Sequence, residues 1–281
     1  MPRIATQCIC CGSAALERQS AVLMPFVALR ALGWEPCEIT ADWGLRDLPL
    51  GHAQALCTSL HCTGCGTLFV DMRFDHAEMA RLYDDYRGPG YEAQRERFEP
   101  GYAARNRALL AGDGHIPQVE AFLRPHLPAQ PAVLDWGGDT GRNTPLRREA
   151  ALHHVLDISG RPLVDGALAV KEPQGPYDLI VLAHVLEHVP EPAALVREIS
   201  AAMAAGTRLY IEVPFEAQMR AAEADPAAWR RKRHWHEHIN FFSAAGLRRL
   251  LEGCSLRVQA EARLALGSQG AEALGLLCGK A

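Results

Sequence analysis

Two cysteine pairs in the first quarter of the chain have the spacing that metal binding requires. Cys8 and Cys11 lie in CICCG, and Cys62 and Cys65 lie in CTGCG. Two residues between the thiolates let a tight turn aim both sulfur atoms at one ion, and the glycine that follows relieves crowding. Two such pairs predict a tetrahedral four-sulfur Zn²⁺ site. Because four thiolates leave no open coordination position, we expect this site to be structural.

Neighbouring residues leave other interpretations of these cysteines open. Cys10 and His61 adjoin the two pairs and are alternative ligands. The 50 residues between the pairs exceed the spacing of a compact zinc ribbon, so we expect an insertion there. A simpler alternative is that the cysteines are ordinary buried or redox-active residues. Four others lack any such spacing, and we interpret them as small apolar residues: Cys37, Cys57, Cys254 and Cys278.

A glycine-rich stretch, VLDWGGDTG at 133–141, indicates nucleotide chemistry. It follows a short apolar run and precedes a segment that we expect to be helical, as nucleotide-binding loops do. Asp157 ends the next predicted strand, 20 residues after Gly137, and this offset suits an acid that binds ribose hydroxyls. The stretch lacks G-x-G-x-x-G and is nearer to D/E-x-G-x-G-x-G, with Asp139 at the middle glycine position. The ligand is therefore a dinucleotide or S-adenosylmethionine (SAM), unless the turn binds nothing.

Two segments rich in histidine and glutamate supply acid–base candidates. HVLEHV at 184–189 contains H-x-x-E-H, which also occurs in zinc proteases. In those enzymes the histidines lie on a sustained helix, whereas here Pro190 and Pro192 follow at once and an apolar strand precedes. We therefore interpret HVLEHV as a loop at the end of a strand. Together with HWHEH at 234–238, it provides imidazoles and a carboxylate suited to proton transfer: His188, His234, His236, Glu237 and His238.

The composition is that of an ordinary globular protein. The 281 residues are 48% hydrophobic and 22% charged. A net charge of −4 argues against nucleic acid as a partner, although the basic run at 230–233 could bind a substrate phosphate or simply face solvent. No segment is apolar over a length that would cross a membrane, and the first residues lack the plan of a secretory signal. We expect a cytoplasmic protein without structural disulfides.

The hydrophobic pattern predicts the elements that must position these residues. Apolar runs predict strands at 132–136, 153–159, 167–170, 177–183, 207–214, 256–264 and 272–280. Helical spacing predicts helices at 75–88, 117–127, 142–150, 191–206 and 243–254, the last capped by Ser243. Strands that alternate with helices predict a doubly wound α/β sheet. We divide the chain into a zinc-binding module at 1–73, a helical linker or lid at 74–130 and the α/β domain at 131–281.

Taken together, these features resemble class I SAM-dependent methyltransferases. The closest resemblance is to a bacterial branch with an N-terminal zinc-binding module, which includes sugar C-methyltransferases and enzymes of polysaccharide clusters. It rests on CICCG with CTGCG, VLDWGGDTG, YDLIVLAHVLEHVPEP and HWHEHINFFS, with RLYDDYRGPGY in support. It implies a Rossmann-like fold with SAM as the cofactor. The residues implied for SAM are Asp135, Gly137, Gly138 and Gly141 at its methionine end, Asp157 at the ribose, Ile158 at the adenine, and Ala183 and His184 at the sulfonium.

The same resemblance implies roles at the methyl acceptor. Sugar C-methyltransferases of this branch carry a tyrosine, a histidine after the fourth strand and a Glu-His pair after the fifth. Those positions are matched by Tyr86 or Tyr91, by His188, and by Glu237 and His238. We expect in-line methyl transfer to a small polar acceptor, such as a nucleotide-linked sugar or an intermediate of glycan or secondary metabolism. Further acceptor contacts, some with a phosphate, are expected from His234, His236, Arg231 and Arg233.

Three alternatives stay open at this stage. Some rRNA methyltransferases also pair a zinc module with this fold, although the acidic charge argues against RNA. A chain whose loop is altered at Asp139 could be a non-catalytic protein that retains the methyltransferase fold. The segment EHINFFS also occurs in methyltransferases with other acceptors, where His238 and Asn240 would mainly anchor a loop above the site.

Overall fold

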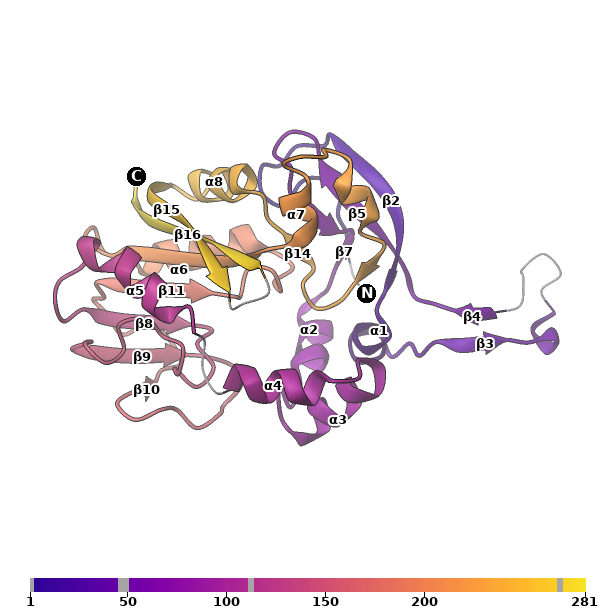
Figure 1. Ribbon diagram of the computed structural model, residues 1–281, viewed down its shortest axis with the longest axis horizontal. Helices are drawn as coiled ribbons and strands as arrows, with labels where there is room; N and C mark the ends of the chain where they lie inside the picture. The colour runs from indigo at the N-terminus through magenta and orange to yellow at the C-terminus, as the bar shows by residue number, and fades with distance from the viewer. Residues whose placement is uncertain (1–2, 45–50, 111–113, 267–269) are drawn as a thin grey trace.

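The computed structural model describes residues 3–44, 51–110, 114–266 and 270–281. Its larger body is a seven-stranded sheet with strand order β10-β9-β8-β11-β12-β16-β15 (Figure 1). The first five of these strands run parallel to one another. β16 pairs antiparallel with β12, and β15 pairs antiparallel with β16. This mixed α/β sheet confirms the predicted fold class. The strands are β8 (Ala132–Trp136), β9 (Leu152–Leu156), β10 (Leu168–Ala169), β11 (Leu179–Ala183), β12 (Arg208–Phe215), β15 (Leu256–Leu266) and β16 (Ala271–Lys280).

Helices cover both faces of this sheet, and the apolar runs of its central strands explain why. Residues of β8 and β11 that point to opposite faces are equally buried, as parallel strands between two layers require. One face packs against α5 (Ile116–Leu123) through Val119 and Leu123. The other face packs against α6 (Pro192–Ala202) and α8 (Ala244–Glu252). The Ser243 side chain accepts a hydrogen bond from the Gly246 backbone N–H, which bears out the predicted cap.

The helix expected at 142–150 does not form, and that prediction was wrong. The segment is a series of turns between β8 and β9. Pro145 has no N–H to donate, and Leu146 adopts a left-handed backbone with φ 61°, which interrupts any helix. The Leu146 N–H instead donates to Glu120 Oε1 of α5 at 2.9 Å. The glycine-rich stretch is therefore followed by a compact turn region rather than by a helix N-terminus.

The smaller body is a five-stranded sheet whose two edge strands come from the distant half of the chain. Its order is β13-β2-β5-β6-β14. β13 pairs in parallel with β2, and β14 pairs antiparallel with β6. The range 131–281 is thus not a separate unit, because two of its strands complete the N-terminal sheet. The strands are β2 (Leu16–Leu23), β5 (Leu56–Cys62), β6 (Leu68–Val70), β13 (His234–Trp235) and β14 (Asn240–Phe241).

Short helices lie beside both sheets, at the junction of the two bodies (Figure 1). They are α1 (Pro25–Leu32), α2 (His76–Tyr83), α3 (Pro89–Phe98) and α4 (Tyr102–Leu110). α2 ends earlier than predicted because Asp85 and Arg87 adopt left-handed backbone, with φ 50° and 58°. α1 packs against α2 and α3. Among the described helices, none has the length and apolar character needed to cross a bilayer.

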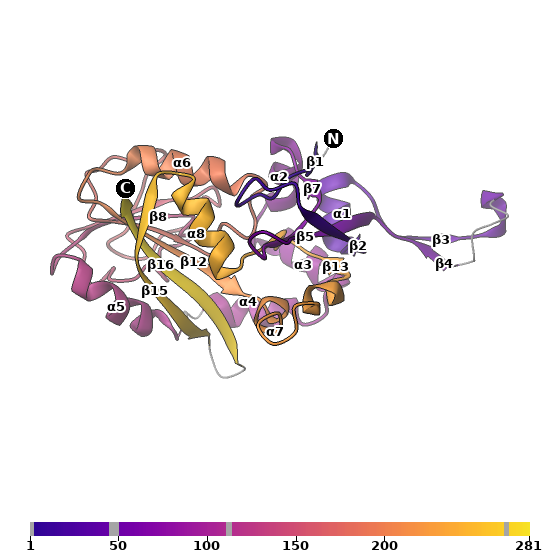
Figure 2. The ribbon, with the colours of Figure 1, turned by 90° about the horizontal axis from the view of Figure 1, so that it is seen from above.

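Two further strand pairs complete the description. β1 (Arg3–Ile4) pairs with β7 (Met72–Arg73). β3 (Cys37–Ile39) and β4 (Gly51–Ala53) form a ribbon that projects away from both bodies, as Figures 1 and 2 show from two directions. This ribbon is the insertion expected between the two cysteine pairs.

Candidate active site and metal centre

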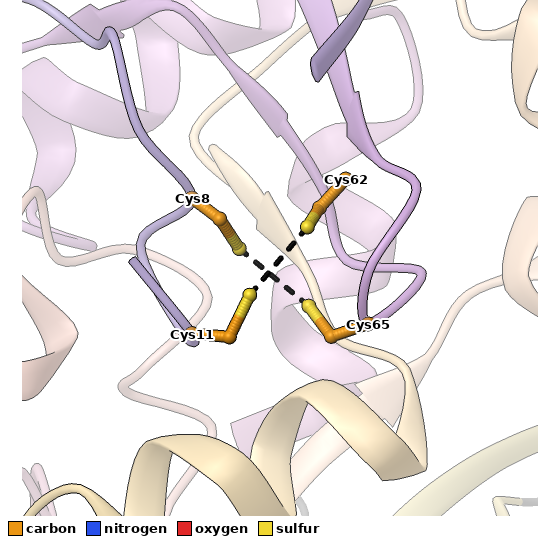
Figure 3. A group of neighbouring side chains, drawn as sticks. All are labelled: Cys8, Cys11, Cys62 and Cys65. Atoms are coloured by element: carbon orange, nitrogen blue, oxygen red, sulfur yellow. Dashed lines mark hydrogen bonds between the residues drawn. The ribbon is translucent and has the colours of Figure 1, made fainter. Parts of the chain in front are cut away.

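The four predicted zinc ligands converge beside the five-stranded sheet. Cys8 Sγ lies 3.5 Å from Cys65 Sγ, and Cys11 Sγ lies 3.5 Å from Cys62 Sγ. The two contacts cross, so the sulfur atoms surround one centre (Figure 3). All four lie within 4.8 Å of one another, as ligands of a single tetrahedral ion must.

Neither alternative ligand joins this group. The Cys10 backbone N–H donates to Cys8 Sγ at 3.4 Å, but the Cys10 side chain is not one of the four that converge. The His61 ring stacks on Trp229 with centroids 4.9 Å apart, and its Nδ1 lies 3.3 Å from Glu17 Oε2. The structure therefore favours the four-cysteine set.

The glycine-rich stretch forms a tight loop at the carboxyl end of β8. Gly137 has φ 83°, and a Cβ there would lie 2.5 Å from Val185 Cγ2. A Cβ at Gly138 would lie 2.4 Å from Asp135 Cγ. A Cβ at either position would force the neighbouring Val185 or Asp135 side chain to move, so the loop favours glycine at both. Asp139 adopts φ 52°, a left-handed conformation that aspartate tolerates better than most residues.

Asp157 lies against this loop, where the sequence predicted a ribose-binding acid. Its Oδ2 accepts a hydrogen bond from the Asp139 N–H at 2.8 Å, and its Oδ1 accepts one from the Ser159 N–H at 2.7 Å. The Asp139 carboxylate in turn lies 3.0 Å from Arg161 Nη1 and 3.5 Å from Arg87 Nη1. Arg87 lies in the turn between α2 and α3, so an ion pair joins this turn to the glycine-rich loop.

Two other predicted cofactor residues have contrasting surroundings. Ile158 is 88% exposed, an open apolar surface at the edge of the loop. Asp135 is buried beneath the loop and accepts a short hydrogen bond from Thr144 Oγ1. Burial raises the pKa of Asp135 to about 7, and Thr144 only partly offsets this.

His184, directly after β11, joins a buried hydrogen-bonded group. His184 Nε2 and His115 Nε2 both lie 2.8 Å from Glu212 Oε1. His184 Nδ1 lies 3.5 Å from Glu187 Oε1. Burial would lower the pKa of His184, but the two carboxylates outweigh it and raise that pKa to about 10. Sequence reasoning missed His115 and Glu212, although a glutamate within the apolar strand TRLYIEVP was a signal.

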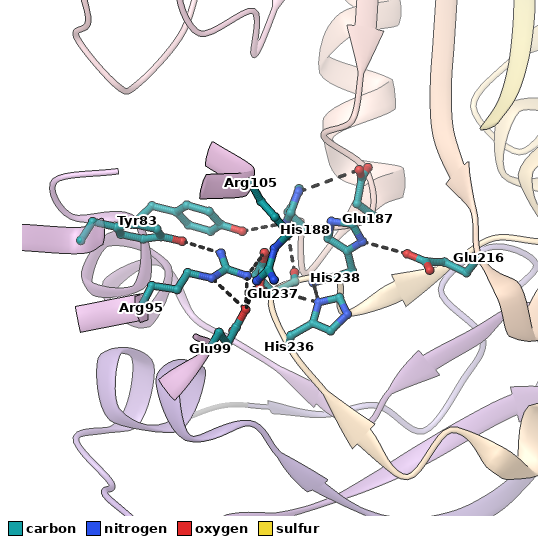
Figure 4. Close-up of polar contacts among 11 residues, drawn as sticks. Tyr83, Arg95, Glu99, Arg105, Glu187, His188, Glu216, His236, Glu237 and His238 are labelled. Atoms are coloured by element: carbon teal, nitrogen blue, oxygen red, sulfur yellow. Dashed lines mark hydrogen bonds and ion pairs between the residues drawn. The ribbon is translucent and has the colours of Figure 1, made fainter. Parts of the chain in front are cut away.

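A second polar cluster lies where α2, α3, the segments directly after β11 and β12, and the loop between β13 and β14 meet (Figure 4). His188 Nδ1 lies 2.8 Å from Tyr83 Oη and 3.1 Å from the Glu237 carbonyl oxygen. His238 Nδ1 lies 2.9 Å from Glu216 Oε1. The two imidazole rings meet edge to face with centroids 4.7 Å apart. The predicted acid–base histidines are thus brought together, each held by a separate partner.

The two histidines have opposite electrostatic surroundings. Burial and the neighbouring imidazole of His238 lower the pKa of His188 to about 4. Burial also acts to lower the pKa of His238, but the hydrogen bond that its ring donates to Glu216 and the charges of Glu187 and Glu237 raise it above its usual value. At neutral pH, His188 is therefore a neutral imidazole, whereas His238 readily holds a proton.

Glu237, the third predicted acid–base residue, is held in an ion pair. Its Oε1 lies 2.5 Å from Arg95 Nη2, and Arg95 Nη1 donates to Tyr91 Oη at 3.1 Å. Burial acts to raise the pKa of Glu237, yet Arg95 and the adjacent histidines lower it to about 2. This geometry makes Glu237 a permanently charged carboxylate that ties α3 to the loop.

Comparison with known proteins identifies the family. A family model described as "Methyltransferase domain" matches residues 102–261, more than half of the chain. The chain belongs to this methyltransferase family. A comparison with curated proteins found no match.

Several solved structures are similar to parts of this methyltransferase. One is 1,6-didemethyltoxoflavin-N1-methyltransferase from Burkholderia thailandensis, with 18% identity and a TM-score of 0.48 over 66% of this chain and 86% of that one. Another is magnesium protoporphyrin IX methyltransferase from Synechocystis PCC 6803, with 17% identity and a TM-score of 0.44 over 66% and 98%. A third is an O-methyltransferase family 2 protein from Planctomyces limnophilus DSM 3776, with 19% identity and a TM-score of 0.42 over 74% and 70%.

The predicted acceptor residues of the methyltransferase fall into two groups. A cavity next to the second cluster is lined by His234, His236, Glu237 and His238, together with Arg95 and Arg105. Tyr86 and Tyr91 pack edge to face nearby, with ring centroids 5.3 Å apart. Arg231 and Arg233 lie outside this cavity and are exposed. Arg231 Nη1 contacts Asp225 at 3.1 Å, and Arg233 Nε donates to the Arg230 carbonyl at 3.2 Å.

Three contacts within this cluster were not predicted from the sequence. Tyr83 contacts His188 in place of the expected Tyr86 or Tyr91. Glu216 holds His238, and Arg95 holds Glu237. Each of these residues lies far from its partner in the sequence, so no motif indicated that the two would meet.

Proposed function

We propose that the protein is a SAM-dependent methyltransferase that acts on a small polar acceptor. The observation that carries this proposal is the loop at the end of β8, where two glycines fit closely against Val185 and Asp135 and Asp157 lies beside them. Such a loop lets a nucleotide approach the backbone, and the acid supplies hydrogen-bond acceptors for ribose hydroxyls. Membership of the methyltransferase family and the mixed α/β sheet support the same conclusion.

In this proposal the cofactor lies across the carboxyl ends of β8, β9 and β11. When bound, SAM supplies an activated methyl group. Asp157 holds the ribose, Ile158 covers the adenine with its exposed side chain, and Ala183 and His184 flank the sulfonium. The methionine end lies along the loop residues Asp135, Gly137, Gly138 and Gly141.

The second cluster receives the acceptor. His234 and His236 line the cavity that receives it, Tyr86 and the fully buried Tyr91 pack nearby, and His188, His238 and Glu237 are the proposed catalytic group. His238 takes a proton from the acceptor while Glu216 holds its Nδ1, and His188 stays neutral beside it. Glu237 acts as a fixed negative charge that favours the protonated form of His238. Holding donor and acceptor in line can itself supply roughly 7–11 kcal/mol.

We further propose the nature of the acceptor and of the metal. The acceptor is a nucleotide-linked sugar or an intermediate of glycan or secondary metabolism. Arg231 and Arg233 would reach only a phosphate that extends beyond the cavity, because both are exposed outside it. Cys8, Cys11, Cys62 and Cys65 hold a structural Zn²⁺, since their four sulfur atoms fit a closed tetrahedral site.

Calorimetry with SAM tests the cofactor site directly. We expect D157N to bind SAM about 10- to 100-fold more weakly, because it removes a charged hydrogen-bond acceptor. E198Q, on the exposed face of α6, is the control and should bind normally. Release of S-adenosylhomocysteine with sugar nucleotides would demonstrate transfer. If the wild-type protein does not bind SAM, the proposal is wrong; if it binds SAM but transfers to no acceptor, the binding-only alternative is favoured.

A further inference from the structure

The group formed by His115, His184 and Glu212 has the composition and geometry of a metal site. The three side chains come from the start of α5, the end of β11 and the interior of β12. Both Nε2 atoms lie 2.8 Å from the same Glu212 oxygen, and the three candidate ligand atoms lie within 4.8 Å of one another. We propose that these residues bind a divalent transition-metal ion, separate from the four-cysteine centre.

The ligand set indicates which ions would bind. Two imidazoles and one carboxylate suit borderline first-row ions such as Fe²⁺, Co²⁺ or Zn²⁺, and are a poor match for Ca²⁺ or Mg²⁺. Three protein ligands leave coordination positions open, whereas the four cysteines leave none. The His184 side chain is 35% exposed, while the other two side chains are almost fully buried. The open positions would therefore face the His184 side of the site.

Neighbouring groups hold the ligands in the way that metal sites require. Ligating histidines normally donate their other ring N–H to a carboxylate or carbonyl, and ligating carboxylates are themselves hydrogen-bonded. Here Glu187 lies 3.5 Å from His184 Nδ1, and Tyr210 Oη donates to Glu212 Oε2. His184 also adopts φ 56°, an uncommon backbone conformation for a residue other than glycine.

Charge balance supports a divalent ion. Glu187 and Glu212 are each 1% exposed, and buried carboxylates are costly unless positive charge lies close by. Glu187 Oε1 makes ion-pair contacts with His184 at 3.5 Å and with His188 at 3.9 Å, and neither of its oxygens is within ordinary hydrogen-bond geometry of a donor. His184 lies against both carboxylates, and a divalent ion held by its imidazole would place two positive charges next to the two negative ones.

The location gives the ion a role, and this step rests on the proposed function. Ala183 pairs in register with Glu212, so the site lies at the carboxyl edge of β11 beside the cofactor loop. Ligands bind at this edge in open α/β sheets. An ion here would take an oxygen atom of the acceptor, a hydroxyl or a carbonyl, into an open position. The two carboxylates would screen its charge from the cofactor's sulfonium.

Co²⁺ titration of the full-length protein, stripped of metal by a chelator under reducing conditions, tests the site. Cobalt bound by thiolates gives intense charge-transfer absorption, whereas cobalt bound by nitrogen and oxygen gives only weak ligand-field bands. We expect the wild type to take up two equivalents, one of each kind. H184N, in which asparagine tolerates the left-handed backbone, should retain only the thiolate equivalent. The exposed H126N is the control and should take up both.

Two further variants separate the metal site from folding. Y210F removes the hydroxyl that orients Glu212, and we expect it to bind the second equivalent about 10- to 100-fold more weakly. E212Q should lose it entirely while the thiolate absorption, which reports a folded N-terminal module, is unchanged. Uptake of one equivalent by the wild type, or of two by H184N or E212Q, would overturn the metal site. SAM calorimetry on the same samples keeps the two proposals apart, because normal SAM binding without a second ion rejects only the metal site.

Discussion

The four-cysteine centre and the cluster around His188 and His238 teach different lessons about how a site is encoded. Each pair of cysteines lies within four residues of sequence, so the spacing itself sets the geometry. The histidine cluster instead takes Tyr83 from α2, Arg95 from α3, and its other members from the segments after β11 and β12 and from the loop between β13 and β14. A local site survives as long as its turns form, whereas an assembled site depends on every element that contributes to it.

The two sites are nevertheless joined, and the largest expected effect exploits this. We expect C62S to lose Zn²⁺ and to unfold the N-terminal sheet, since structural zinc contributes about 10–16 kcal/mol in small zinc modules. Because β13 and β14 are edge strands of that sheet, methyl transfer should be lost as well. Zinc content and the melting temperature measure the effect. C37S, on the exposed ribbon, is the matched control. A C62S protein that melts like the wild type would mean that the two sites are independent.

The next variant should separate a loss of catalysis from a loss of folding or of SAM binding. We expect H238N to reduce methyl transfer about 10²- to 10⁴-fold, because it removes the proposed proton acceptor. Its SAM affinity and melting temperature should stay unchanged, as they should in the H126N control. Single-turnover rates and calorimetry provide the measurements. A parallel loss of SAM affinity would show instead that His238 mainly anchors the loop.

A smaller effect concerns the carboxylate that holds this histidine. His238 must be neutral to accept a proton, and Glu216, Glu187 and Glu237 raise its pKa against the opposing effect of burial. Activity should therefore increase with pH through a value above about 6.5, the ordinary pKa of histidine. E216Q removes one negative charge and should move this increase to lower pH, with E198Q as the control. A pH–rate profile that E216Q does not shift would remove proton acceptance by His238 from the mechanism.

The smallest effect is expected at the exposed arginines. Surface charges contribute little, so R231E combined with R233E should raise the KM of a phosphate-bearing acceptor only about two- to fivefold. The increase should shrink at high salt because exposed charges are screened. R257E, on the exposed face of β15, should leave KM unchanged. If the KM of the double variant equals that of the wild type at low salt, these arginines do not belong to the acceptor site.

The features that could be predicted from the sequence are those set by local residue patterns, and the features that were missed are contacts between distant elements. The strands of the large sheet, the Ser243 cap and the convergence of the four cysteines follow from local pattern and spacing. The helix at 142–150 was wrong because one left-handed residue, Leu146, outweighs a favourable composition. The contacts that Tyr83, Arg95 and Glu216 make with the cluster were missed because their partners lie far away in sequence. Pairing of this kind is decided by tertiary packing, which no local pattern records.

The origin of the two outer strands of the small sheet has a consequence for biosynthesis. The outer edges of β2 and β6 pair with β13 and β14, which lie near residues 235 and 240. The hydrogen-bonding groups on these edges therefore stay unpaired until most of the polypeptide has left the ribosome. At normal translation rates this interval is on the order of ten seconds. Open strand edges are sites of intermolecular pairing. Nascent chains of this protein should therefore depend on early zinc loading or on chaperones to avoid aggregation.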